Sequence, residues 1–175
     1  MWTQGVPLLF NRPHLGQVFE IKTAGNCVDQ SCIESVKYAI EHIEPPPKLI
    51  LVMGHTKCGA VTACYNCLTD SKNHNLRMEF PFIMTALEEQ TRIQIEKHKD
   101  NKDLAIHEAS AENAKSEAQK LVFIFNDLLE KYGISVYSGL YDIESGKVDF
   151  TKIVSNVGEN EEVQKQIEEM RVVGK

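Results

Sequence analysis

The stretch Leu49-Ile-Leu-Val-Met-Gly-His-Thr-Lys-Cys-Gly-Ala60 decides the fold of this chain. The run from Lys48 to Met53 is too apolar for a strand with one face in water, so it predicts a central parallel strand covered on both faces. After Gly54, His55 and Cys58 come three residues apart and precede a predicted helix over residues 59–68. Imidazole nitrogen and thiolate sulfur are ligands that Zn²⁺ prefers, so this strand end is a candidate metal site that still needs a third ligand.

Strand and helix patterns alternate on both sides of this stretch. Residues 17–21 alternate apolar and polar side chains and predict a strand. Asp29 or Ser31 can cap a helix that the prolines at 45–47 end. Further along, the patterns predict helices over residues 81–97 and 109–132, a C-cap at Gly133, and a hairpin formed by strands over 134–143 and 148–150. This alternation predicts an α/β fold with a mostly parallel sheet flanked by helices.

Composition limits the class of protein. The 175 residues fit one domain, which we place at residues 1–155, followed by a charged C-terminal segment over residues 156–175 that we expect to be helical. A net charge of −6 argues against a nucleic-acid partner, and no apolar run approaches the roughly 20 residues that span a membrane. The N-terminal residues have no basic region followed by an apolar stretch, so we expect no signal peptide. Five cysteines without a secreted pattern favour reduced thiols and an intracellular, most simply cytoplasmic, location.

The cysteines leave two other interpretations open. His55 could cap the strand end while Cys58 packs under the following helix, with no metal involved. Cys64 and Cys67 form a Cys-x-x-Cys pair, which can be redox active at a helix N-terminus or can join His55 and Cys58 in a four-ligand set. This pair lies in the middle of the predicted helix, and its distance from Cys58 is shorter than zinc-ribbon spacing, so core-facing thiols are favoured.

Four segments in order resemble the β-class carbonic anhydrase family. Lys22-Thr-Ala-Gly-Asn26 resembles the family's Arg-Asn-Ala-Gly-Asn, and Ser35-Val-Lys-Tyr-Ala39 its Ser-x-x-Tyr-Ala helix. Gly54-His-Thr-Lys-Cys-Gly-Ala60 resembles the zinc motif Gly-His-Ser/Thr-x-Cys-Gly-Ala, and Gly139–Val148 the closing hairpin. The resemblance implies a β-carbonic-anhydrase-like fold, a Zn²⁺ cofactor, CO₂ and bicarbonate as substrates, and a homodimer or higher oligomer. It places the metal on His55 and Cys58 and the substrate cleft near Gly59, Ala24, Gly25 and Asn26.

The same resemblance exposes a departure at the N-terminus. The family's first zinc ligand and its Asp-Arg pair come from a Cys-x-Asp-x-Arg strand, whose register falls here on Met1, Thr3 and Gly5. A thioether is a poor zinc ligand beside a thiolate, and Gly5 offers no guanidinium. We therefore expect a chain that lacks the family's N-terminal helices and first strand, either by truncation, which leaves an organellar location open, or by evolved loss.

Two functions follow from this departure. The first is a zinc lyase of the carbonic anhydrase type whose CO₂ hydration is weak or absent, with no catalytic residue at Thr3 or Gly5. The second is a catalytically inactive family member that serves as a binding or oligomerisation module. Cys27, next to the Ala24–Asn26 turn, is the best substitute third ligand, and a small buried thiol is its other interpretation.

Overall fold

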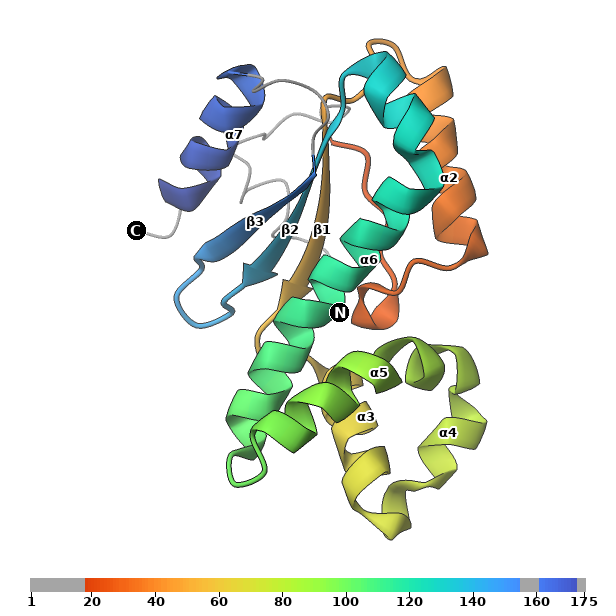
Figure 1. Cartoon of the computed structure of the whole chain (residues 1–175), viewed down its shortest axis with the longest axis vertical. Helices are drawn as coiled ribbons and strands as arrows, with labels where there is room; N and C mark the ends of the chain where they lie inside the picture. The colour runs from red at the N-terminus through yellow and green to blue at the C-terminus, as the bar shows by residue number, and fades with distance from the viewer. Residues whose placement is uncertain (1–17, 155–160, 173–175) are drawn as a thin grey trace.

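The computed structural model describes residues 18–154 and 161–172, and its centre is a three-stranded sheet (Figure 1). The strands are β1 (Leu49–His55), β2 (Ser135–Tyr141) and β3 (Val148–Val154), in the order β1-β2-β3. β1 and β2 pair in parallel, whereas β2 and β3 form the predicted antiparallel hairpin. The expected α/β fold with helices around the sheet is therefore confirmed, and the described sheet is mixed.

The helices lie close to where the sequence predicts them. Their bounds are η1 (Ala24–Asn26), α2 (Gln30–His42), α3 (Gly59–Thr69), η2 (Ser71–Asn73), α4 (Asn75–Glu79), α5 (Pro81–Lys97), α6 (Lys102–Tyr132) and α7 (Glu161–Val172). Asp29 rather than Ser31 caps α2, because its carboxylate accepts a hydrogen bond from the Cys32 amide at 2.8 Å. α6 begins earlier than predicted, since the Asn101 side chain accepts from the Leu104 amide and caps it there. Gly133 ends α6 in the left-handed conformation, with φ of 65°, as predicted.

Helices cover both faces of the sheet (Figure 1). α2 and α6 pack on one face, where Val36, Ile40, Leu121 and Phe125 join Val52 and Val136 in one buried cluster. α7 packs on the other face through Val163, Ile167 and Met170, which bury Tyr137 together with partly buried Leu49, Leu51 and Phe150. The charged C-terminal segment therefore contains a helix that contributes to the core, while the proposed division at residue 155 stays a prediction.

One prediction about strands is wrong, and a second is confirmed only in its parallel pairing. Residues 18–23 form no strand, although their side chains alternate between apolar and polar. The apolar Phe19 is 51% exposed and is therefore not buried as the strand prediction required. β1 is not central among the described strands: it lies at one edge of the sheet, and three of its first four residues are only partly buried. β2 has neighbours on both sides and is buried along six of its seven residues. How deeply a strand is buried depends on which strands lie beside it, and an apolar run in the sequence does not identify those neighbours.

The carboxyl end of β1 leads directly into α3, which packs with α5 and the first half of α6 below the sheet (Figure 1). This lower cluster buries Cys58, Val61, Cys64, Cys67 and Leu87. The junction of the sheet and the lower cluster therefore falls on the turn that joins His55 to Cys58. Among the described helices, none combines the length and the hydropathy needed to cross a lipid bilayer.

Candidate metal centre

His55 and Cys58 lie at the two ends of one tight turn. His55 is the last residue of β1, where it pairs with Tyr141 of β2, and Cys58 occupies the N-cap position of α3. Between them Lys57 adopts the left-handed conformation with φ of 56°, which is uncommon for a residue with a side chain. The turn reverses the chain at Lys57 and so brings the imidazole and the thiol together.

The hydrogen bonds of His55 define the state of its ring. Nδ1 lies 2.9 Å from the Thr56 carbonyl oxygen. A carbonyl only accepts, so Nδ1 carries the proton and a neutral ring keeps its lone pair on Nε2. The Cys58 thiol also forms a hydrogen bond with the imidazole, and this bond raises the pKa of His55 despite the opposing effect of burial. A neutral imidazole binds a metal through the ring nitrogen that carries no proton, which here is Nε2, the nitrogen on the Cys58 side.

Cys58 is buried, with 4% of its surface exposed. Burial alone raises the pKa of a thiol, but the His55 hydrogen bond and the amides of Val61 and Ala60 outweigh it, so the pKa of Cys58 is held below its ordinary value. The two amides belong to the first turn of α3, whose unpaired N–H groups stabilise an anion. The turn therefore favours a thiolate, which is the form of cysteine that binds zinc.

The Ala24–Asn26 turn lies against this site. Gly25, with φ of 69°, packs so closely that an added Cβ would lie 3.1 Å from Leu87 and 3.4 Å from Ala60. The Asn26 side-chain oxygen lies 3.6 Å from the corresponding Cβ position on Gly54. The side-chain nitrogen of Asn26 is buried without a hydrogen-bond partner. The turn is thus in contact with both β1 and α3 on either side of the His55–Cys58 turn.

Three polar residues on one face of α6 hold the Ala24–Asn26 turn and the residues that follow it. Asn113 donates to the Gly25 carbonyl at 2.8 Å, and the buried Glu117 accepts from the Val28 amide at 2.8 Å. Lys120 donates to the Val28 carbonyl and lies 3.7 Å from Glu117. We did not predict these residues from the sequence. Their spacing of four and three residues, within the apolar stripe of α6, is the spacing that places side chains on one face of a helix.

Cys27 lies near the pair but is engaged elsewhere. Its thiol donates to the Gly25 carbonyl at 3.7 Å, and it packs at the border of the buried cluster that contains Cys58. Burial, with a contribution from the Glu117 carboxylate, raises the pKa of Cys27 to about 11. These contacts favour a neutral thiol over a zinc-binding thiolate at this position.

The described residues bring together two candidate metal ligands and no third. No three His, Cys, Asp or Glu side chains in residues 18–154 and 161–172 gather closely enough to hold a metal ion. Met1, Thr3 and Gly5 lie outside the described residues. Cys64 and Cys67 are buried, as predicted, Cys64 in the middle of α3 and Cys67 in its last turn, and the Cys64 thiol donates to the Met84 carbonyl at 3.9 Å. His55 and Cys58 thus supply one nitrogen and one sulfur, while zinc sites use three or four protein ligands.

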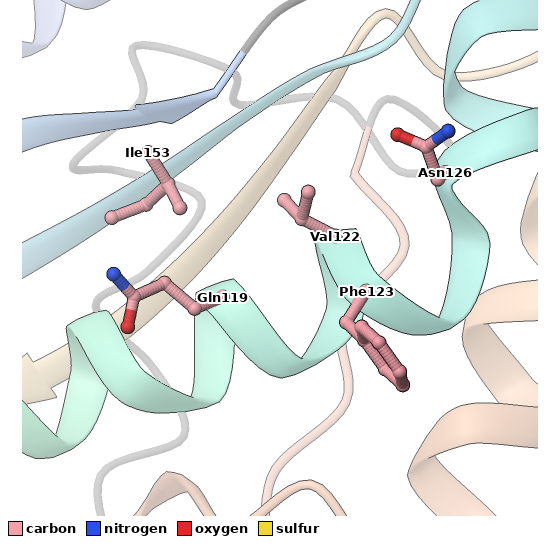
Figure 2. Close-up of a pocket in the computed structure, with 5 residues that line it drawn as sticks. All are labelled: Gln119, Val122, Phe123, Asn126 and Ile153. Carbon is pink, nitrogen blue, oxygen red and sulfur yellow. The ribbon is translucent and has the colours of Figure 1, made fainter.

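The surroundings of the pair include open space. An added Cβ on Gly59, the first residue of α3, would meet nothing within 4 Å. A separate apolar hollow of 520 Å³ lies between α6 and β3, lined by Gln119, Val122, Phe123, Asn126 and Ile153 (Figure 2). Ile153 lies near the start of β1 by the strand register, so this hollow is at the opposite end of the sheet from His55. The space beside Gly59, by contrast, adjoins Cys58 directly in the sequence.

Known proteins match this chain over most of its length or over a shorter segment. A family profile described as carbonic anhydrase matches residues 6–148. A carbonic anhydrase of Mycolicibacterium smegmatis is 38% identical over 58 residues, which are 33% of this chain and 27% of that protein. Carbonic anhydrase 2 of Mycobacterium tuberculosis is 39% identical over 56 residues, covering 32% of this chain and 26% of that protein. The matched segment is therefore about a quarter of the length of these curated relatives.

Solved structures agree on the fold. The β-carbonic anhydrase CcaA superimposes with a TM-score of 0.66 at 23% identity, covering 86% of this chain and 73% of that one. The β-carbonic anhydrase CafA of Aspergillus fumigatus gives 0.66 at 21% identity, with 95% and 77% coverage. A tetrameric β-carbonic anhydrase of Sordaria macrospora gives 0.67 at 17% identity, with 83% and 73% coverage.

Proposed function

Because this chain belongs to the β-class carbonic anhydrase family, we propose that His55 and Cys58 are the retained half of a zinc centre for reversible hydration of CO₂ to bicarbonate. The observation that carries the proposal is the tight turn that places the His55 imidazole, with Nδ1 on the Thr56 carbonyl, in hydrogen-bond contact with the Cys58 thiol, whose pKa is lowered. In a complete centre, zinc supplies a hydroxide nucleophile near neutral pH. Cys58 would bind as the thiolate and His55 through Nε2, while the Ala24–Asn26 turn would border the substrate.

We further propose that this chain by itself hydrates CO₂ weakly or not at all. Met1, Thr3 and Gly5 stand at the family positions of the first cysteine ligand, the aspartate and the arginine. Methionine brings no negative charge to the metal, and neither threonine nor glycine provides a carboxylate–guanidinium pair to control the fourth position. Two protein ligands leave the remaining positions of the metal to water, so zinc would bind less tightly than in a three-ligand site.

The test is to measure zinc per chain and CO₂ hydration on the same purified sample. We expect substoichiometric zinc without added metal, and hydration close to the uncatalysed rate. Cys58→Ser should abolish the zinc that remains, whereas the matched variant Cys27→Ser should retain it. One tightly held zinc per chain, with turnover typical of the family, would contradict the proposal, and loss of zinc in Cys27→Ser would make Cys27 the third ligand.

A second function, an inactive binding or oligomerisation module, is supported by exposed apolar side chains. Met78, Phe82 and Phe123 are 84%, 86% and 88% exposed, and an interface with a second copy or a partner would remove such apolar surface from water. The Sordaria macrospora neighbour is tetrameric, and we propose that this chain likewise forms a homodimer or higher oligomer. Light scattering on the intact chain should give at least twice the 19.8 kDa mass, and a stable monomer would contradict this proposal.

The five free cysteines support a reducing compartment. We therefore propose an intracellular location for the chain, with the cytoplasm as the simplest choice. Fractionation of cells that express the tagged chain would test this, and recovery from the medium would contradict it.

A further inference from the structure

Thr56, which lies between the two candidate ligands, is buried and forms three hydrogen bonds. Its exposed fraction is 6%. Its amide donates to the Tyr141 carbonyl at 2.9 Å, and its hydroxyl accepts from the Ile143 amide at 3.1 Å. Its carbonyl accepts from His55 Nδ1 at 2.9 Å. The hydroxyl bond is a long-range one, because residues 56 and 143 are 87 positions apart.

The partner of Thr56 is itself an ordered hairpin turn. The Asp142 carboxylate accepts from the amides of Glu144 and Ser145 at 2.8 and 2.7 Å, and these two bonds lower the pKa of Asp142. Lys57, next to Thr56, forms an ion pair with Glu144 of the same turn. The β2–β3 connection therefore holds the His55–Cys58 turn from one side at two successive residues.

We propose that Thr56 is a positioning residue: by anchoring to Tyr141 and Ile143 it aims its carbonyl at His55 Nδ1 and so presents Nε2 to Cys58 and to a metal. The anchored amide and hydroxyl restrict the backbone of Thr56, and the left-handed Lys57 that follows fixes the next peptide plane. Without these constraints the carbonyl could rotate, and Nδ1 would lose the acceptor that selects the tautomer.

The metal part of this inference rests on the proposed function, but the tautomer does not. We expect ¹⁵N NMR of the metal-free full chain, at a pH where imidazole is neutral, to show His55 protonated at Nδ1. Thr56→Val removes only the hydroxyl acceptor and should give a mixture of tautomers, whereas Thr56→Ser keeps the hydroxyl and should restore the wild-type signal. Thr69→Val is the matched control, because the Thr69 hydroxyl donates to the Tyr65 carbonyl on an exposed part of α3, away from the pair.

Three results would overturn the proposal: an Nε2-protonated His55 in the wild type, an unchanged tautomer in Thr56→Val, or failure of Thr56→Ser to restore the signal. The wild-type spectrum tests the predicted Nδ1-protonated tautomer of His55 even if Thr56→Val does not fold. Zinc titration against a chromophoric chelator adds a second readout, in which Thr56→Val should bind about tenfold more weakly than the wild type. If the wild type binds no measurable zinc while its tautomer follows the prediction, the proposed function fails and the positioning role stands.

Discussion

At the scale of single residues, close packing decides which side chain the site can accept. Gly54 precedes His55 in β1, and α6 crosses it so closely that an added Cβ would lie 2.8 Å from the Ser110 carbonyl oxygen. That oxygen belongs to helix backbone, which cannot move away easily. Gly59, on the other side of Cys58, has open space instead. The two glycines of the motif therefore differ in their surroundings. A side chain at position 54 would collide with α6, whereas the absence of a side chain at position 59 leaves open space beside Cys58.

This difference predicts opposite outcomes for the same substitution. Gly54→Ala should lower the free energy of unfolding by about 1–3 kcal/mol through overpacking against α6. Gly59→Ala, its matched control, should be neutral or slightly stabilising, since alanine favours helix. Denaturant unfolding of both variants checks the prediction. Equal stability losses in the two variants would show that the approach of α6 to Gly54 is not as close as described.

The chemistry of His55 and Cys58 could be predicted from the sequence, because their spacing and their place at a strand end are local properties. The contacts that tune them could not. Thr56 meets Ile143, and Glu117 meets Val28, across 87 and 89 residues of sequence, and no local pattern reports such pairs.

At the scale of elements, local signals fixed most helix ends. α2 begins where Asp29 accepts from the Cys32 amide and ends at His42, with Ile43 as its C-cap and the prolines at 45–47 just beyond. Strands were harder to predict, because a strand needs a partner. The alternating pattern before Lys22 forms no strand among the described residues, and β1 lies at an edge of the described sheet. Helix signals lie within the segment, whereas strand pairing is a property of the whole sheet.

Removal of the α2 cap tests the element-scale interpretation. Asp29→Ala should lower the free energy of unfolding by about 1 kcal/mol, since the Cys32 amide loses its acceptor. Ser31→Ala, at the other candidate cap position, should change it by less than about 0.5 kcal/mol. Thermal unfolding of both variants measures the difference. A larger loss of stability in Ser31→Ala than in Asp29→Ala would show that Ser31, and not Asp29, caps α2.

At the scale of the whole molecule, the sheet is covered on both faces by helices from distant parts of the chain. α2 and α6 cover one face, and α7 covers the other with Val163, Ile167 and Met170 (Figure 1). Gln164 of α7 also donates to the Tyr137 hydroxyl at 2.9 Å. The charged composition of the C-terminal segment predicted a helix but gave no sign of its docking, because the described contact rests on a few apolar residues within a charged sequence.

Truncation of one α7 side chain tests this docking. Ile167 is 2% exposed, so Ile167→Ala should lower the free energy of unfolding by about 2–5 kcal/mol, or release α7 alone. Lys165→Ala, on the exposed face of the same helix, should change it by less than about 0.5 kcal/mol. Unfolding curves combined with limited proteolysis distinguish the two outcomes for Ile167→Ala. Resistance of both variants to protease, at wild-type stability, would contradict the docking of α7.

We propose that this chain binds zinc through one sulfur, from Cys58, and one imidazole, from His55. X-ray absorption at the zinc edge of the zinc-loaded chain counts these ligands directly. We expect one sulfur at about 2.3 Å, one imidazole nitrogen, and oxygen donors in the remaining positions. Two sulfurs per zinc would contradict it by bringing in Cys27 or another thiol, and the absence of sulfur would contradict it by removing Cys58 from the metal.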